Sequence, residues 1–246
     1  MPNSGYYRFP SIHQDRLIFT CEDDLWTVSS QGGMARRLTA GLAECSRPCI
    51  SPDGRLVAFT GREEGHPEVY VMPTGGGPVR RLTYFGAFIC HVVGWRGDEI
   101  LFATTHGQPF LKLTTIFAVS AEGGEPRSLE LGSAQTLSYG PEGQVALGRN
   151  TLDIARWKRY RGGTAGNIWV DSDGSGDFRL LTPQADGQPI KGNLANPMCV
   201  GDRVYFVSDH EGVGNLYACR PDGTGLERHT DHVEYYVRNP STDGAQ

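Results

Sequence analysis

Several features that would point to a function are missing from this chain. Only three of its 23 lysines and arginines are lysines, and no run of about 18 apolar residues is present to span a membrane. The first ten residues lack an apolar core behind a basic stretch, so no cleavable secretory signal is expected. The net charge of −5 argues against a nucleic-acid binder. We therefore expect a cytoplasmic protein with no nucleic-acid or membrane partner.

Cysteine patterns and catalytic motifs are also missing. None of the six cysteines forms a Cys-x-x-Cys pair, and several lie in apolar runs, where a small buried thiol is the ordinary occupant. We expect buried, reduced thiols rather than disulfides or a metal site. No Gly-x-Ser-x-Gly elbow, phosphate-binding glycine loop or His-Glu-x-x-His sequence occurs. The sequence therefore predicts no catalytic residue, no metal ligand and no cofactor.

Glycine, by contrast, is abundant and marks an internal repeat. The 33 glycines make up about 13% of the chain, against a typical ~7%. An aliphatic residue followed by an aromatic one recurs at Leu25-Trp26, Val69-Tyr70, Ile116-Phe117, Ile168-Trp169 and Leu216-Tyr217. A glycine follows each aromatic after six or seven residues, and the thirteenth residue after it is Thr39, Thr83, Glu130, Thr182 or Thr230. Because hairpin turns need positive φ, each unit is predicted to be two strands joined by a glycine turn.

A second hairpin is predicted upstream of each unit, with the clearest turns at 51–54 and 140–143. Each repeat then holds about four short strands, and the spacings between successive aromatics are 44, 47, 52 and 48 residues. Repeats of this length with four strands are typical of β-propeller blades. The sequence therefore predicts an all-β protein, a β-propeller of four-stranded blades.

The blade boundaries follow from the repeat. A single domain is predicted, with blades at about 5–43, 44–87, 88–132, 133–190 and 191–235. Residues 238–244 resemble the opening of the second blade at 47–54, so 236–246 are predicted to begin a sixth blade. A first strand without its partners is marginal. We therefore expect five complete blades and the start of a sixth, in a fragment of a longer protein.

Cations and aromatic residues alternate in the longest predicted loop, 149–166. Its candidate contact residues are Arg156, Lys158, Arg159 and Arg161. Arginine pairs with carboxylates or phosphates through two parallel hydrogen bonds, and aromatic rings add stacking. In the alternative interpretation, Trp157 and Tyr160 anchor the loop on a neighbouring blade while the cations are solvated or paired. Both interpretations stay open at this stage.

Carboxylates gather where the predicted second strands end. They are Glu22, Asp23, Asp24, Glu63, Glu64, Asp209 and Glu211. Propeller glycosidases bring such acids together at the central channel. The third and fourth repeats lack them, so we expect solvated loop acids. Metal sites at His210, or at His229 and His232, lack the further ligands that such sites need.

Several motifs together resemble the N-terminal six-bladed propeller of the tricorn protease family, of actinobacterial type. They lie at Cys21–Trp26, Arg81–Phe85, Arg149–Thr151, Trp157–Thr164 and 230–244. The block at 157–164 is the most specific, and the resemblance covers essentially the whole chain. The Asp-Gly and Leu-Thr motifs are shared by other propellers, including those of the TolB type.

The resemblance implies a large cytosolic serine peptidase that trims oligopeptides to short peptides, assembles as a homo-hexamer and passes its products to aminopeptidases. The family's catalytic residues belong to a C-terminal region, and its propeller is implied to act as a gated channel and positioning module. The Arg-Arg pair that anchors the substrate carboxylate in the family has no counterpart at 86–91, so that role is assigned to no residue here. The alternatives are a TolB- or WD40-like interaction propeller and a propeller glycosidase.

Overall fold

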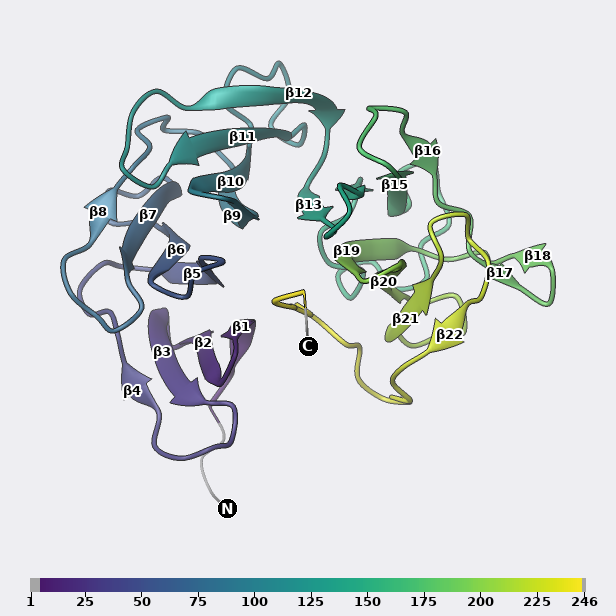
Figure 1. Ribbon diagram of the computed structural model, residues 1–246, viewed down its shortest axis with the longest axis horizontal. Coiled ribbons are helices and arrows are strands. Elements are labelled where there is room, and N and C mark those ends of the chain that lie inside the picture. The colour runs from purple at the N-terminus through teal and green to yellow at the C-terminus, as the bar shows by residue number, and fades with distance from the viewer. Residues whose placement is uncertain (1–4, 245–246) are drawn as a thin grey trace. The chain divides into compact units, whose positions relative to one another are not determined.

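The computed structural model describes residues 5–244, and all of the regular elements within them are β-strands (Figure 1). Five antiparallel sheets have four strands each, paired in chain order, and one small hairpin stands apart from them. The prediction of an all-β chain built from four-stranded propeller blades is confirmed. The chain divides into two compact units, Met1–Ser133 with Ser241–Asp243 and Ala134–Pro240 with Gly244–Gln246.

Unit 1 contains three blades. The first comprises β1 (Arg8–His13), β2 (Arg16–Cys21), β3 (Asp24–Ser29) and β4 (Arg36–Arg37). The second comprises β5 (Cys45–Ile50), β6 (Leu56–Gly61), β7 (Glu68–Pro73) and β8 (Arg80–Arg81). The third comprises β9 (Cys90–Arg96), β10 (Glu99–Thr104), β11 (Thr115–Ser120) and β12 (Arg127–Ser133). Within this unit β1, β5 and β9 lie on the inner side and β4, β8 and β12 on the outer side (Figure 1).

Unit 2 contains two blades and the hairpin. The fourth blade comprises β13 (Thr136–Tyr139), β14 (Val145–Arg149), β15 (Asn167–Asp171) and β16 (Arg179–Leu180). The hairpin is formed by β17 (Gln184–Ala185) and β18 (Gln188–Pro189). The fifth blade comprises β19 (Leu194–Val200), β20 (Arg203–Ser208), β21 (Asn215–Cys219) and β22 (Glu227–Arg228).

The segment predicted to begin a sixth blade forms no strand over its described part, 236–244. Its last two residues, 245 and 246, lie outside the described residues. The main-chain N–H of Val237 donates to the Gly214 carbonyl at 2.8 Å, so the segment follows the fifth blade at this point. The sixth blade therefore stays a prediction, as do the blade boundaries and the single domain.

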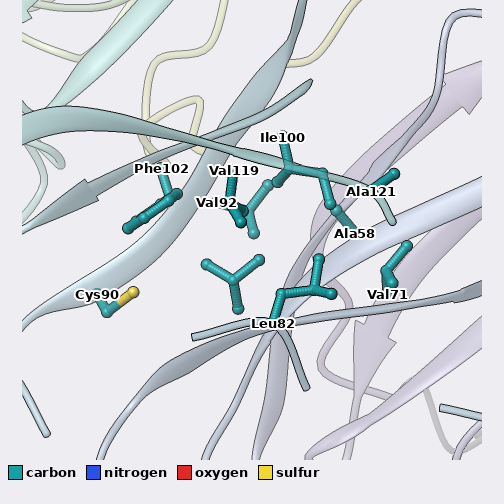
Figure 2. Packing of buried hydrophobic residues seen from close by; sticks show 10 residues of the cluster. Ala58, Val71, Leu82, Cys90, Val92, Ile100, Phe102, Val119 and Ala121 are labelled. Carbon is teal, nitrogen blue, oxygen red and sulfur yellow. The ribbon is translucent and has the colours of Figure 1, made fainter. Parts of the chain in front are cut away.

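The core lies between neighbouring blades. The central strands β6 and β7 are buried almost throughout, because a blade packs against its neighbours on both faces. Figure 2 shows Val71 and Leu82 of the second blade beside Val92, Ile100 and Phe102 of the third. Burying a side chain of this size stabilises the fold by about 1.5–3 kcal/mol. Within each unit, the apolar residues of neighbouring blades thus form one packed layer between them.

The glycine turns have the predicted conformation. Between the third and fourth strands of the five blades, positive φ occurs at Gly32 (89°), Gly76 (90°), Gly123 (96°), Gly176 (91°) and Gly223 (87°). Side chains resist this region, so glycine at these positions lets each outer strand turn back onto its blade.

The repeated threonine closes the second blade. Thr83 Oγ1 accepts a hydrogen bond from the Val69 main-chain N–H at 2.9 Å and donates to the carboxylate of Glu68, which is fully buried. The same carboxylate accepts from Gly86 N at 2.8 Å and pairs with Arg81 at 3.3 Å. The outer strand is thereby tied to the start of the third strand, and we call this arrangement the threonine lock.

Two other blades repeat the threonine lock. In the first blade Thr39 Oγ1 accepts from Leu25 N at 2.9 Å and donates to Asp24 Oδ1 at 2.7 Å. In the fifth blade Thr230 Oγ1 accepts from Leu216 N at 2.9 Å. Thr230 also donates to Asn215 Oδ1 at 2.8 Å. In the fourth blade Thr182 is exposed, and its hydroxyl contacts the Leu180 carbonyl at 3.4 Å. The spacing of thirteen residues therefore marks a closing contact in three of the five blades.

Hydrogen bonds to main-chain carbonyls join the successive blades of unit 1 and, in unit 2, join the hairpin at Gln184 to the fifth blade. The bonds run from Arg36 Nη2 to Gly75 O (3.0 Å), from Arg80 Nη2 to Ala121 O (2.7 Å) and from Gln184 N to Gly223 O (2.9 Å). Each acceptor lies in the turn between the third and fourth strands of the following blade. We call these contacts the blade junctions.

The cysteines are free thiols, of which five are buried and Cys49 is half-buried. Burial raises the pKa of the Cys45 and Cys199 thiols to about 11. The prediction of buried thiols is confirmed for five of the six residues.

Candidate functional site

The loop between β14 and β15 carries the predicted contact residues and belongs to unit 2. Short turns shape it, through main-chain bonds from Arg156 to Asp153 (3.2 Å), from Tyr160 to Trp157 (3.3 Å) and from Ala165 to Gly162 (2.9 Å). Its cations fall within residues 153–161, which we call the cation loop.

A buried carboxylate from the fifth blade holds the cation loop. Asp209, directly after β20, is 0% exposed. Its oxygens accept from Arg159 N at 2.7 Å, from Arg161 Nη1 at 3.2 Å and from both the main-chain N and Nδ2 of Asn193 at 3.0 Å. A buried charge is tolerated when it is paired and hydrogen-bonded in this way. We call Asp209 with Asn193 the buried anchor.

Asn193 extends the anchor to Tyr160 and to Gly166, directly before β15. Its Nδ2 donates to the Tyr160 carbonyl at 3.1 Å, and its Oδ1 accepts from Gly166 N at 3.0 Å. Asn193 is itself 2% exposed. The main chain from Arg159 to Gly166 is therefore fixed to the fifth blade by side chains that water does not reach.

The cation loop also packs against the segment after the fifth blade. Ile154 is buried against Tyr236 and Val237, and the Lys158 ammonium lies 5.1 Å from the centre of the Tyr236 ring. Asp153 forms an ion pair with Arg238. These contacts explain how a loop without strands keeps one shape.

Trp157 does not anchor the loop on a blade, contrary to the alternative interpretation. Its side chain is 65% exposed and meets the edge of the Tyr160 ring, with 5.4 Å between centroids. Tyr160 is half-buried. The anchoring role belongs instead to Ile154 and to the main chain bound by Asp209.

The four predicted contact residues divide into two kinds. Arg161 pairs with Asp209, and Lys158 packs over Tyr236. Arg156 and Arg159 are exposed, and across residues 5–244 neither guanidinium group pairs with a carboxylate. Arg159 has a φ of 56°, a conformation that costs a non-glycine residue about 1 kcal/mol and that its N–H bond to Asp209 stabilises.

The expectation of solvated loop acids is wrong for two residues. Asp209 is fully buried and Asp24 is 7% exposed, each bound by an arginine and by further donors. Glu22, Asp23, Glu63, Glu64 and Glu211 are exposed, as expected. Spacing places all of these carboxylates near strand ends, but their burial depends on partners far away in the sequence.

Sequence reasoning missed the buried Glu68 and Asn193. A signal for Glu68 was present, because a polar residue directly precedes each aliphatic-aromatic pair: Asp24, Glu68, Thr115, Asn167 and Asn215. Three of these take part in threonine locks. Asn193 carries no comparable signal in the sequence.

Next to the buried anchor lies His210, whose Nε2 is 4.0 Å from the Glu211 carboxylate. The His210 ring is 4.6 Å from the Tyr217 ring, and its Nδ1 lies 3.1 Å from Ser208 Oγ. Burial lowers the pKa of His210 from its ordinary value. Tyr217 donates to Glu211 at 2.8 Å, and burial together with this carboxylate raises the pKa of the Tyr217 hydroxyl.

Within 5–244, no three histidine, cysteine or acidic side chains gather closely enough to hold a metal ion. No helix there is long and apolar enough to cross a bilayer. A hollow of about 440 Å³ in unit 1 is lined by residues 80–85 and 122–126. Its arginines bind the Ala121 carbonyl and Glu68, so they serve the fold.

Blades of this topology define a β-propeller module, and the comparisons with known proteins identify its family. The chain belongs to the family described as "Tricorn protease N-terminal beta propeller domain", whose model matches residues 4–246. "Tricorn protease homolog 1" of Streptomyces coelicolor is 42% identical over 251 residues, covering 98% of this chain and 22% of that protein. The chain therefore spans about a fifth of the length of this curated relative.

Two more similar proteins bear on the comparison. A "Putative Tricorn-like protease N-terminal subunit" of Sulfurisphaera tokodaii is 30% identical over 174 residues, covering 69% of this chain and 88% of that protein. The crystal structure of the tricorn protease matches with a TM-score of 0.87 at 32% identity, covering 98% of this chain and 24% of that one. The resemblance predicted from the sequence is confirmed.

Proposed function

We propose that this chain serves as the non-catalytic propeller of a cytoplasmic serine peptidase that degrades oligopeptides to short peptides. The observation that carries the proposal is the family match over residues 4–246. Since the chain spans only about a fifth of its curated relative, the hydrolytic chemistry is assigned to other parts of the protein. The propeller's own task is to act as a channel or gate for peptides and to position the catalytic part.

The partners follow from the same proposal. They are oligopeptide substrates or products, the remaining domains and subunits of the peptidase in a homo-hexamer, and aminopeptidases that receive the products. The relative named as an N-terminal subunit supports a division of labour between a propeller part and a further part. Arg156, Lys158, Arg159 and Arg161 are the proposed contacts with peptides or with a neighbouring domain. The firm attachment of their loop to the fifth blade supports this role.

The test uses the full-length protein that contains this propeller. We expect it to hydrolyse oligopeptides and to react with a serine-directed fluorophosphonate, with loss of activity. Mass spectrometry of the labelled protein should place the modified serine outside residues 1–246. Absence of both hydrolysis and label, or a label within 1–246 that accounts for the lost activity, would refute the proposal.

A further inference from the structure

The cation loop presents Arg156, Trp157 and Arg159 to solvent. Trp157 is 65% exposed, whereas Trp26, Trp95 and Trp169, the other tryptophans of the sequence, are half-buried. Neither guanidinium group pairs with a carboxylate within the described residues. We call these three side chains the outer face of the cation loop.

The main chain beneath the outer face is held in place before any partner binds. Asp209 binds the main chain at Arg159 and Ile154 is buried. A surface that is already ordered loses less conformational entropy on binding than a flexible loop does. Tryptophan and arginine are also the residues most often found to dominate binding energy at protein interfaces.

The charge of the loop points to an anionic partner. Residues 156–161 contain four cations, and the nearby carboxylates are already used: Asp209 binds Arg161 and Asp153 binds Arg238. A local excess of positive charge therefore remains on a chain whose net charge is −5. Carboxylates relieve this repulsion and match the planar donors of arginine.

We propose that the outer face binds an acidic peptide segment, with carboxylates on Arg156 and Arg159 and an apolar side chain against Trp157. This deepens the proposed function by naming the partner class of its contact residues. A peptide fits better than a nucleic acid, because the net negative charge of the chain opposes a long phosphate backbone, whereas two guanidinium groups suit isolated carboxylates. The exposed indole adds an apolar contact that glutamate-rich segments with interspersed leucines provide.

The experiment measures binding of a fluorescein-labelled peptide of alternating glutamate and leucine to the full-length protein, by fluorescence anisotropy with the fluorophosphonate present. We expect saturable binding that weakens as salt rises, at least tenfold weaker binding of the glutamine version, and quenching of Trp157 emission. The double variant R156E/R159E should bind the acidic peptide at least tenfold more weakly. Trp157→Ala should bind it several-fold more weakly with the same salt dependence.

The matched control is Arg179→Glu, which reverses an exposed charge in the same unit whose partner is the exposed Asp177. It should change the affinity less than twofold, and thermal melting should show that all variants fold. Four results would each overturn the inference. They are equal weakening of binding by Arg179→Glu, equal binding of the glutamine peptide, no binding up to 1 mM peptide, and tighter binding of a single-stranded oligonucleotide of equal charge. Failure of the protein to hydrolyse peptides or react with fluorophosphonate would refute the proposed function and leave this binding result unaffected.

Discussion

Replacement of Thr83 by valine tests the threonine lock directly. Valine keeps the shape but removes the hydroxyl, so the buried Val69 N–H loses its acceptor at 2.9 Å and the buried Glu68 carboxylate loses one donor. An unsatisfied buried amide costs about 1–3 kcal/mol, and a hydrogen bond to a charged group contributes about 1.5–3 kcal/mol. Because the methyl group of valine is buried more favourably than a hydroxyl, part of this cost is offset. We therefore expect Thr83→Val to lower the free energy of unfolding by about 3 kcal/mol.

The loss is measured as a change in melting temperature by calorimetry. For a protein of this size 1 kcal/mol corresponds to about 2–4 °C, so Thr83→Val should melt about 6–12 °C lower. Thr83→Ser retains the hydroxyl and should lose far less. Thr182→Val is the matched control, since Thr182 occupies the same repeat position but is exposed, and its effect should stay within about 0.5 kcal/mol. Equal destabilisation by Thr83→Val and Thr182→Val would show that the lock does not stabilise the blade.

Two further predictions concern the buried anchor and its neighbour. Asp209→Ala leaves the buried donors of Asn193 and the Arg159 N–H unpaired, so it should lower the free energy of unfolding, measured by chemical denaturation, by about 3 kcal/mol. The control Asp177→Ala removes a surface ion pair and should lower it by less than about 0.5 kcal/mol. Burial lowers the folded-state pKa of His210, so the unfolded chain binds the proton more readily: stability is complete above the ordinary value of 6.5 and falls as the pH drops below it. Denaturant titrations at pH 5–8 give the free energy of unfolding at each pH. His210→Gln should reduce the dependence of this free energy on pH, while replacement of the exposed His66 should not. Equal pH dependence in the wild type and both variants would contradict the role of His210.

The blades were predictable because the information that specifies them is local. A glycine such as Gly76 at a turn, an apolar pair such as Val69-Tyr70 and Thr83 at a fixed spacing all lie within about fifteen residues of one another. Hairpins are built from just such short-range patterns. The four strands and the glycine turn of each of the five blades could therefore be located from the sequence alone, whereas the hairpin β17–β18 and the exposure of Thr182 could not.

The candidate site was predictable only in part, because its construction depends on distant residues. The cations and Trp157 stand out in the sequence, but the bond from Arg159 to Asp209 joins residues 50 positions apart. Nothing near Asp209 distinguishes it from an exposed acid such as Glu211. The division of the four exposed cations into two that contact Asp209 or Tyr236 and two whose guanidinium groups pair with no carboxylate in the described residues therefore needed the structure.

The blade junctions have a consequence for how such a protein changes over time. In each blade junction the hydrogen-bond acceptor is a main-chain oxygen, namely that of Gly75, Ala121 or Gly223. We call the turn that carries this oxygen the receiving turn. Every residue type supplies the same oxygen, so a substitution in a receiving turn keeps the acceptor as long as the turn keeps its length and path. The turn glycines with positive φ are the exception, and a Cβ at Gly223 would also lie 2.2 Å from the Thr182 carbonyl oxygen. Outside these glycines the blade junctions therefore tolerate substitution, whereas an inserted residue moves the acceptor and breaks the contact.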